Sequence, residues 1–126
     1  MHPIISPSRW NWTMHELSLA GSAVELIEAT ARREGFSRVR VVWMEIGALS
    51  CVEPDALRLA FEAAARGSCA EHARLELIDV PGVGHCPACD RPSPMTEIYA
   101  LCPHCGDRPL RVLRGTEMRL KNLDVE

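Results

Sequence analysis

Two Cys-x-x-Cys pairs constrain this chain more than any other feature of its sequence. Cys86 and Cys89 form the first pair, and Cys102 and Cys105 form the second, with residues 90–101 between them. Four thiolates folded toward one point can surround one tetrahedral Zn²⁺ at about 2.3 Å each, which leaves no open position for catalysis. The spacing therefore predicts a structural zinc site, with two disulfides or two redox dithiols as the alternatives.

The two Cys-x-x-Cys turns, called knuckles below, have further features that support a metal site. Proline follows the first cysteine of each pair and stiffens the turn, and Gly106 stands where a knuckle commonly needs a positive φ. His85 and His104 flank the thiolates. They are either alternative or supporting metal donors, or exposed polar residues.

Composition narrows the class of protein. The 126 residues suggest one domain, perhaps with a small appendage, and the net charge of −3 argues against nucleic acid as the main partner. No apolar run approaches the roughly 18 residues of a membrane span, and the start lacks the layout of a signal peptide. Six cysteines without an export signal indicate a reducing compartment, so we expect a cytoplasmic protein.

Helical periodicity predicts two amphipathic helices. The first runs from Met14 to about Arg33, and the second begins at Pro54 and closes at Gly67. The apolar half of the first helix is expected to face a core and comprises Leu17, Leu19, Ala20, Ala23, Val24, Leu26, Ile27 and Ala31. In the second helix the corresponding positions are Leu57, Phe61 and Ala64.

Three strands are predicted over residues 38–49, 73–80 and 117–125, where β-formers or alternating apolar residues occur. The first has little polar interruption and fits a central position better than an edge. The fold class expected is α+β: a small three-stranded mixed sheet with two helices, plus an inserted zinc-ribbon-like module with four cysteine ligands.

The expected division of the chain follows from these elements. Residues 1–13, which have no helical or strand periodicity, are expected to be a disordered or loosely attached N-terminal extension, or not to be part of the native protein; residues 14–82 and 115–126 form an α/β domain, and residues 83–114 form the zinc domain. If the strands on either side of the insert pair antiparallel, the zinc module is an enlarged hairpin tip. It could then tilt as a body, because few contacts need cross the linkers.

A second candidate metal site lies at Met14-His15-Glu16. An amino-terminal amine, a nearby imidazole and the intervening amides can form fused chelate rings in a plane, a geometry that suits Ni²⁺ or Cu²⁺. The triplet alone is weak evidence, because a single histidine at a helix start is more often a cap or a surface residue.

Several segments together resemble the HypA/HybF family of hydrogenase nickel-incorporation proteins. They are Met14-His15-Glu16-Leu17-Ser18-Leu19-Ala20, Glu45-Ile46-Gly47-Ala48-Leu49-Ser50, Val52-Glu53-Pro54 and the two Cys-Pro-x-Cys knuckles. The resemblance implies that His15 binds nickel, with Glu16 contributing its amide or modulating the site and with the amine of Met14 if translation begins there. It also implies structural zinc at Cys86, Cys89, Cys102 and Cys105.

The same resemblance implies a function and partners. The protein would be a nickel metallochaperone for [NiFe]-hydrogenase maturation, working with the GTPase HypB and the hydrogenase large subunit, and in some members with urease maturation proteins. One departure is that 13 residues precede Met14 and would block its amine. Either translation begins at Met14, or the extension is real and His15 binds nickel more weakly with side-chain donors.

Two other function classes compete with this interpretation. A zinc-ribbon module for nucleic acid or a protein partner would need a basic face, yet residues 85–114 carry four arginines against three acidic residues, a formal +1. A thiol–disulfide enzyme would need its Cys-x-x-Cys at a helix N-terminus in a βαβ unit. No Ser-His-Asp set, phosphate loop or paired carboxylates occur, so we do not expect an enzyme.

Overall fold

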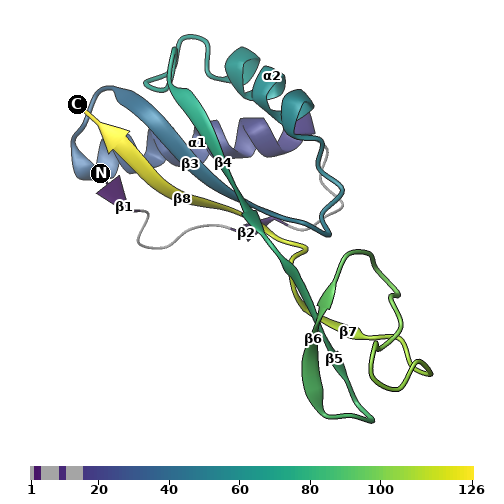
Figure 1. Ribbon diagram of the computed structural model, residues 1–126. Helices are drawn as coiled ribbons and strands as arrows, with labels where there is room; N and C mark the ends of the chain where they lie inside the picture. Colours follow the sequence, from purple (N-terminus) through teal and green to yellow (C-terminus); the bar gives the residue numbers. More distant parts are fainter. Residues whose placement is uncertain (1, 4–8, 11–15) are drawn as a thin grey trace.

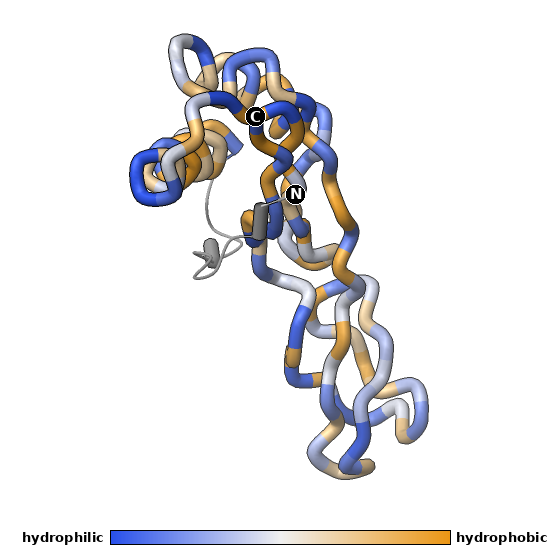
Figure 2. Tube along the Cα trace, turned by 90° about the vertical axis from the view of Figure 1, so that its left-hand side faces the viewer, coloured by the Kyte–Doolittle hydropathy of each residue, from blue (hydrophilic) through white to orange (hydrophobic). Residues whose placement is uncertain are grey.

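The computed structural model of the protein describes residues 2–3, 9–10 and 16–126. A larger sheet carries both helices on one face, and a smaller sheet extends from one end of it (Figure 1). The rotated view in Figure 2 shows the same division, with the helices beside the larger sheet and the smaller sheet below it. The expected α+β class, with two helices, a mixed sheet and a four-cysteine module, is confirmed.

The larger sheet is built on a central strand. Strand β3 (Val39–Gly47) pairs parallel with β4 (Arg74–Val80) and antiparallel with β8 (Met118–Val125). The predicted central position of β3 is therefore correct. Because β4 and β8 lie on opposite sides of β3, they do not pair with each other. The prediction that the zinc module is an enlarged hairpin tip depended on that pairing and is therefore wrong.

The outer edge of β8 carries two short strands near the start of the chain. Strands β1 (His2–Pro3) and β2 (Arg9–Trp10) both pair antiparallel with β8. We expected no strand in residues 1–13, and at these four positions that expectation was wrong. The reason is that main-chain pairing with an existing edge needs no alternation of apolar and polar residues in the added segment.

The helices begin and end where local chemistry permits. Helix α1 (Glu16–Glu34) is followed by Gly35 at φ 82°, a conformation that glycine adopts without strain. Helix α2 (Pro54–Ala64) begins with proline, and the side chain of Glu53 caps it by accepting a hydrogen bond from the amide of Ala56 at 2.8 Å.

The core of the body lies between the helices and one face of the larger sheet. Leu57 and Phe61 of α2 are buried there as predicted, and so are Leu19 and Ile27 of α1. Leu17, which was predicted to lie on the apolar half of α1, is 68% exposed, whereas the packing of the helix begins at Leu19.

The smaller sheet contains three strands that the proline-rich sequence did not indicate. Strand β5 (Gly82–Cys86) is central and pairs antiparallel with β6 (Arg91–Met95) and β7 (Arg111–Arg114). Strand β6 contains Pro92 and Pro94, and an edge strand tolerates proline because one row of its amides faces away from the ladder.

The body and the smaller sheet meet at a neck where main chains approach closely. The amide of Gly47 donates to the carbonyl of Glu117 at 2.9 Å, and the amide of Leu49 donates to the carbonyl of Gly115 at 2.7 Å. The amide of Ala48 donates to the carbonyl of Val80 at 2.8 Å. The loop after β3 therefore binds both chain crossings on the side of the body.

Candidate metal centre

Four cysteine sulfurs gather in the smaller sheet. Cys86 is the last residue of β5, Cys89 follows in the turn to β6, and Cys102 and Cys105 lie in the loop before β7. Their Sγ atoms all lie within 4.8 Å of one another, and this is the one such group of metal-ligating side chains found in the described residues. The predicted pairs therefore converge on one point.

The two knuckles have similar main-chain hydrogen bonds, although the amide that donates to the first sulfur lies three residues after it in the first knuckle and two residues after it in the second. The amide of Cys89 donates to Cys86 Sγ at 3.4 Å, and that of Asp90 donates to the Cys86 carbonyl at 2.8 Å. In the second knuckle the amide of His104 donates to Cys102 Sγ at 3.4 Å, and that of Gly106 donates to the Cys102 carbonyl at 2.8 Å. Each turn therefore presents its first sulfur with an amide already directed at it.

Each knuckle closes with a residue in the left-handed region. Gly106 has φ 69°, as the sequence predicted, and Asp90 occupies the equivalent place in the first knuckle with φ 52°. Sequence reasoning missed Asp90, although its distance of four residues from Cys86 matches that of Gly106 from Cys102. Aspartate tolerates this conformation better than most residues with a side chain.

The spacing of the sulfurs fits a tetrahedral ion. Four Zn–S bonds of about 2.3 Å in tetrahedral geometry place the sulfurs about 3.8 Å apart. Cys86 Sγ lies 3.8 Å from Cys105 Sγ, and Cys102 Sγ lies 3.9 Å from Cys89 Sγ. No disulfide links any of the six cysteines. The cluster can hold a metal ion such as zinc.

The electrostatics of the four thiols are uneven. Main-chain amides of Cys105 and His104 donate to Cys102 and lower its pKa to about 7. Burial, reinforced by hydrogen bonds to the neighbouring thiols, raises the pKa of Cys89 to about 12. A cation among the sulfurs would remove this asymmetry, because it stabilises all four thiolates together.

The cluster is packed into its own small hydrophobic core. Cys86 and Cys102 are buried against Met95 and Leu110, and they share this core with Leu49 from the loop after β3. Leu49 is thus a body residue that packs in the cysteine module. The spacing of apolar residues around Leu49 does not predict this contact, because the contact depends on how the chain folds where the two sheets meet.

The two histidines beside the cysteines do not join the sulfur cluster. His85 Nε2 lies 3.0 Å from Asp90 Oδ1, so its ring reaches across the knuckle to a carboxylate. His104 is exposed and contributes its main-chain amide to Cys102 Sγ. In this geometry both support the knuckles, and neither places a ring nitrogen in the four-sulfur group.

The predicted nickel site lies partly outside the described residues. Met14 and His15 are not described, whereas Glu16 begins α1. One carboxylate oxygen of Glu16 accepts a hydrogen bond from the amide of Glu53 at 3.2 Å. The start of α1 is therefore tied to the start of α2, and Glu53, which sequence reasoning did not single out, lies next to the first turn of α1.

Comparisons with known proteins agree with this arrangement. The family profile described as "Hydrogenase/urease nickel incorporation, metallochaperone, hypA" matches residues 14–125. The hydrogenase maturation factor HypA of Dechloromonas aromatica (strain RCB) is 51% identical over 113 residues, which cover 90% of this chain and all of that protein. The chain belongs to the HypA family. It is thus a nickel metallochaperone of hydrogenase and urease maturation, and the zinc-ribbon alternative is not favoured.

Other members of the HypA family agree in sequence and in fold. The HypA of Azotobacter vinelandii is 45% identical over 113 residues, again 90% of this chain and all of that protein. The solution structure of the Ni metallochaperone HypA from Helicobacter pylori superposes with a TM-score of 0.68 at 26% identity, covering 89% of this chain and 97% of that one. Of the helices described here, none has the length and apolar character needed to cross a bilayer.

Proposed function

We propose that this member of the HypA family carries Ni²⁺ at the amino end of α1 and transfers it to hydrogenase precursors, while zinc at the four cysteines holds the outlying module together. The observation that supports the nickel site most directly is that the family profile begins at residue 14, the first residue of Met14-His15-Glu16. The imidazole of His15 then belongs to the residue immediately before α1.

The donor set proposed for nickel is made of nitrogens. The imidazole of His15, the amine of Met14 and the deprotonated amides of His15 and Glu16 would supply a planar arrangement that suits Ni²⁺. Cu²⁺ binds such donors more tightly by the Irving–Williams order, so selectivity would depend on metal availability and on the partner. Reprotonation of an amine or amide opens the chelate, which gives a route for release.

Glu16 has a supporting place in this site. Its carboxylate accepts the amide of Glu53, so it holds the first turn of α1 beside the cap of α2. This contact fixes Glu16, the first residue of the helix at whose amino end the nickel donors are proposed.

Zinc is proposed at Cys86, Cys89, Cys102 and Cys105. The sulfur separations of 3.8 and 3.9 Å support tetrahedral coordination, and four thiolate ligands leave no place for a reacting water. The small core beside the cluster is too limited to stabilise the module alone, so metal binding would supply much of its folding free energy. Thiolates stay reduced in the cytoplasm, where we place this protein.

The partners proposed are the GTPase HypB and the [NiFe]-hydrogenase large subunit, with urease maturation proteins as further candidates. The support is the family profile, which names both hydrogenase and urease nickel incorporation. Any GTP hydrolysis in nickel delivery would belong to the partner.

A nickel titration tests the site. Calorimetry would compare protein beginning at Met1 with protein beginning at Met14, and each with its His15→Ala variant. We expect tight binding only when Met14 carries a free amine, and its loss in His15→Ala while zinc content stays unchanged. His72→Ala is the matched control, because His72 lies on the loop before β4 and not in the Met14-His15-Glu16 triplet. Nickel affinity that survives His15→Ala in both proteins would disprove the assignment.

A further inference from the structure

Three polar residues are buried in the described part of the chain, namely Thr30, Ser50 and Ser93. The hydroxyl of Thr30 donates to the carbonyl of Leu26 at 2.7 Å, and that of Ser50 donates to the carbonyl of Gly47 at 2.7 Å. Ser93 is 2% exposed, and among the described residues its Oγ has no hydrogen-bond partner. Burying a hydroxyl without a partner is costly, so a partner is expected for this one.

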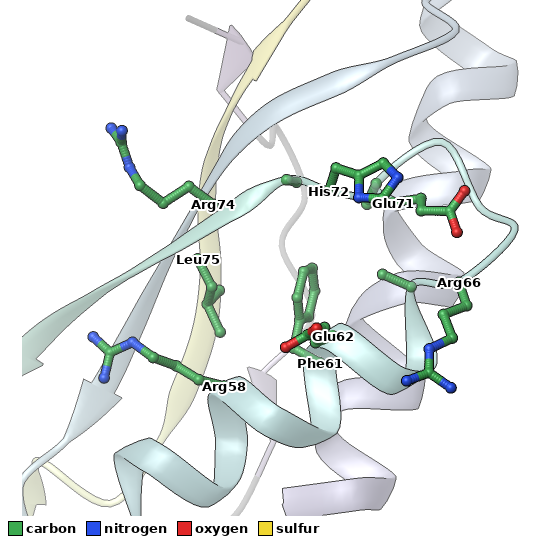
Figure 3. A pocket seen from close by; sticks show the side chains of 11 residues that line it. Arg58, Phe61, Glu62, Arg66, Glu71, His72, Arg74 and Leu75 are labelled. Carbon is green, nitrogen blue, oxygen red and sulfur yellow. The ribbon is translucent and has the colours of Figure 1, made fainter.

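The polar side chains around the hollow between α2 and β4 are in a different situation (Figure 3). This hollow has a volume of about 500 Å³, and Phe61 and Leu75 at its floor belong to the buried core of the body. Arg58, Glu62 and Arg66 stand exposed around it. Water already hydrates such side chains, so they do not require a ligand, whereas the buried hydroxyl of the cysteine module does require a partner.

Ser93 lies on the face of the smaller sheet that carries Cys86. It pairs with Gly84 of β5, and Cys86 stands two residues further along that strand. Opposite residues of an antiparallel pair share a face, and so do alternate residues of one strand. Burial follows the same alternation, since Ser93 and Met95 are the buried residues of β6. The Ser93 hydroxyl and the Cys86 sulfur are therefore diagonal neighbours on one face.

The space opposite Ser93 is filled by groups without oxygen or nitrogen. Gly84 has no side chain, and a Cβ atom there would overlap Sδ of Met95 and Cβ of Leu110. These two side chains therefore cover Gly84. Within the described module Ser93 is the one buried polar residue, and the sulfur of Cys86 is the acceptor that shares its face.

The sulfur of Cys86 has room for another donor. It accepts the amide of Cys89 at 3.4 Å, and a zinc-bound thiolate keeps further lone pairs. Donors to the sulfurs offset the net negative charge that four thiolates leave around Zn²⁺. Cys86 is 0% exposed, so bulk water cannot provide such a donor, whereas Cys105 is exposed and reaches solvent. A donor for Cys86 therefore has to come from the protein.

We propose that Ser93 is a positioning residue of the zinc site, whose hydroxyl donates a hydrogen bond to Cys86 Sγ when zinc is bound. Diagonal neighbours in an antiparallel pair have Cβ atoms less than about 7–8 Å apart, and rotation of the serine side chain between its staggered positions turns Oγ toward the sulfur. The bond holds Cys86 in its orientation at the ion and gives the buried hydroxyl its partner. This role rests on the zinc site proposed above and adds no ligand to it.

Zinc affinity of the full-length protein tests this role. Competition with a chromogenic chelator would compare the wild type with Ser93→Ala and Ser93→Thr. We expect Ser93→Ala to weaken zinc binding about tenfold or more, as loss of a hydrogen bond to a metal ligand does. Ser93→Thr keeps the hydroxyl and should recover most of that loss. Thr96→Ala is the matched control, because it removes an exposed hydroxyl from the same module and should leave the affinity unchanged.

A spectroscopic signature separates the hydrogen bond from simple packing. With ¹¹³Cd in place of zinc, we expect the hydroxyl proton of Ser93 in the wild type to exchange slowly and to show coupling to the metal through the sulfur. The ¹¹³Cd signal should move in Ser93→Ala and stay in place in Thr96→Ala. Amide spectra of residues 82–114 would show that the module is folded in each variant, and the coupling in the wild type needs no variant at all.

The role of Ser93 is refuted if Ser93→Ala binds zinc as tightly as the wild type. It is also refuted if the affinity falls but the ¹¹³Cd signal stays in place and Ser93→Thr restores nothing, because Ser93 then only packs in the core. Metal analysis of the wild type separates these failures from failure of the zinc site itself. A wild-type protein that takes up neither ion would refute both.

Discussion

A Cβ atom on Gly47 would overlap the main-chain carbonyl of Gly115. Gly115 in turn lies against Gly82, where its own Cβ would fall 2.5 Å from the Gly82 Cα. Residues from the end of β3, the start of β5 and the approach to β8 thus meet backbone to backbone. The cysteine module is attached to the body through these contacts. Substitutions at the neck should therefore lower the stability of both parts of the molecule.

Substitution of Gly115 by alanine should destabilise the joint. Gly115 has φ 109°, outside the region that residues with a side chain readily adopt, and the added methyl group would meet the main chain of Gly82. We expect a loss of at least about 2 kcal/mol in the free energy of unfolding, measured with urea. Gly21→Ala is the control: it lies within α1 with nothing within 4 Å, so it should stabilise by about 1 kcal/mol. Equal effects of the two substitutions would contradict the close approach.

Leu49→Ala should loosen the module from the body. Leu49 is buried in the same core as Cys86 and Met95, and removing a buried leucine side chain costs about 2–5 kcal/mol. Faster amide exchange in β5 and β6 would report the effect. Leu59→Ala removes the same atoms from a side chain that is 70% exposed and should change stability by less than about 0.5 kcal/mol. An unchanged exchange rate in β5 would show that Leu49 does not couple the two parts.

Removal of zinc with a chelator, or the substitution Cys86→Ala, should unfold the smaller sheet and leave α1 and α2 folded. The reason is that the body has its own core, whereas the module's core consists largely of residues around the sulfurs. NMR spectra would show loss of dispersion for residues 82–114 alone. Cys51→Ala is the control, since Cys51 is exposed and outside the cluster. Collapse of the α1 signals on chelation would mean that the body depends on the metal.

Zinc uptake should release protons, and zinc affinity should rise with pH. Cys89, with its pKa raised to about 12, keeps its proton at pH 7, while Cys102, with its pKa lowered to about 7, is partly ionised. Metal binding requires both thiolates, so at least one proton must leave at neutral pH, and raising the pH reduces the number displaced. A pH indicator in weakly buffered solution would count them. Zinc binding without proton release would contradict this distribution of protons.

Much of the site could be predicted from local spacing. In each pair two residues separate the cysteines and a proline follows the first of them, and Gly106 comes directly after the second pair. These are local features that define a knuckle, and both knuckles form in the structure. The ends of β3, β4 and α1 could likewise be read to within one or two residues, since periodicity and breakers are local properties.

The order of residues therefore predicts most of the helices and strands, the sulfur cluster and, through combined motifs, the family. The folded structure alone shows that β3 separates β4 from β8, that Leu49 packs in the cysteine module and that β4 is the last strand in the order of the larger sheet. These relationships join residues far apart in the chain. Their energies come from shared burial and main-chain pairing, for which a linear sequence carries no local pattern.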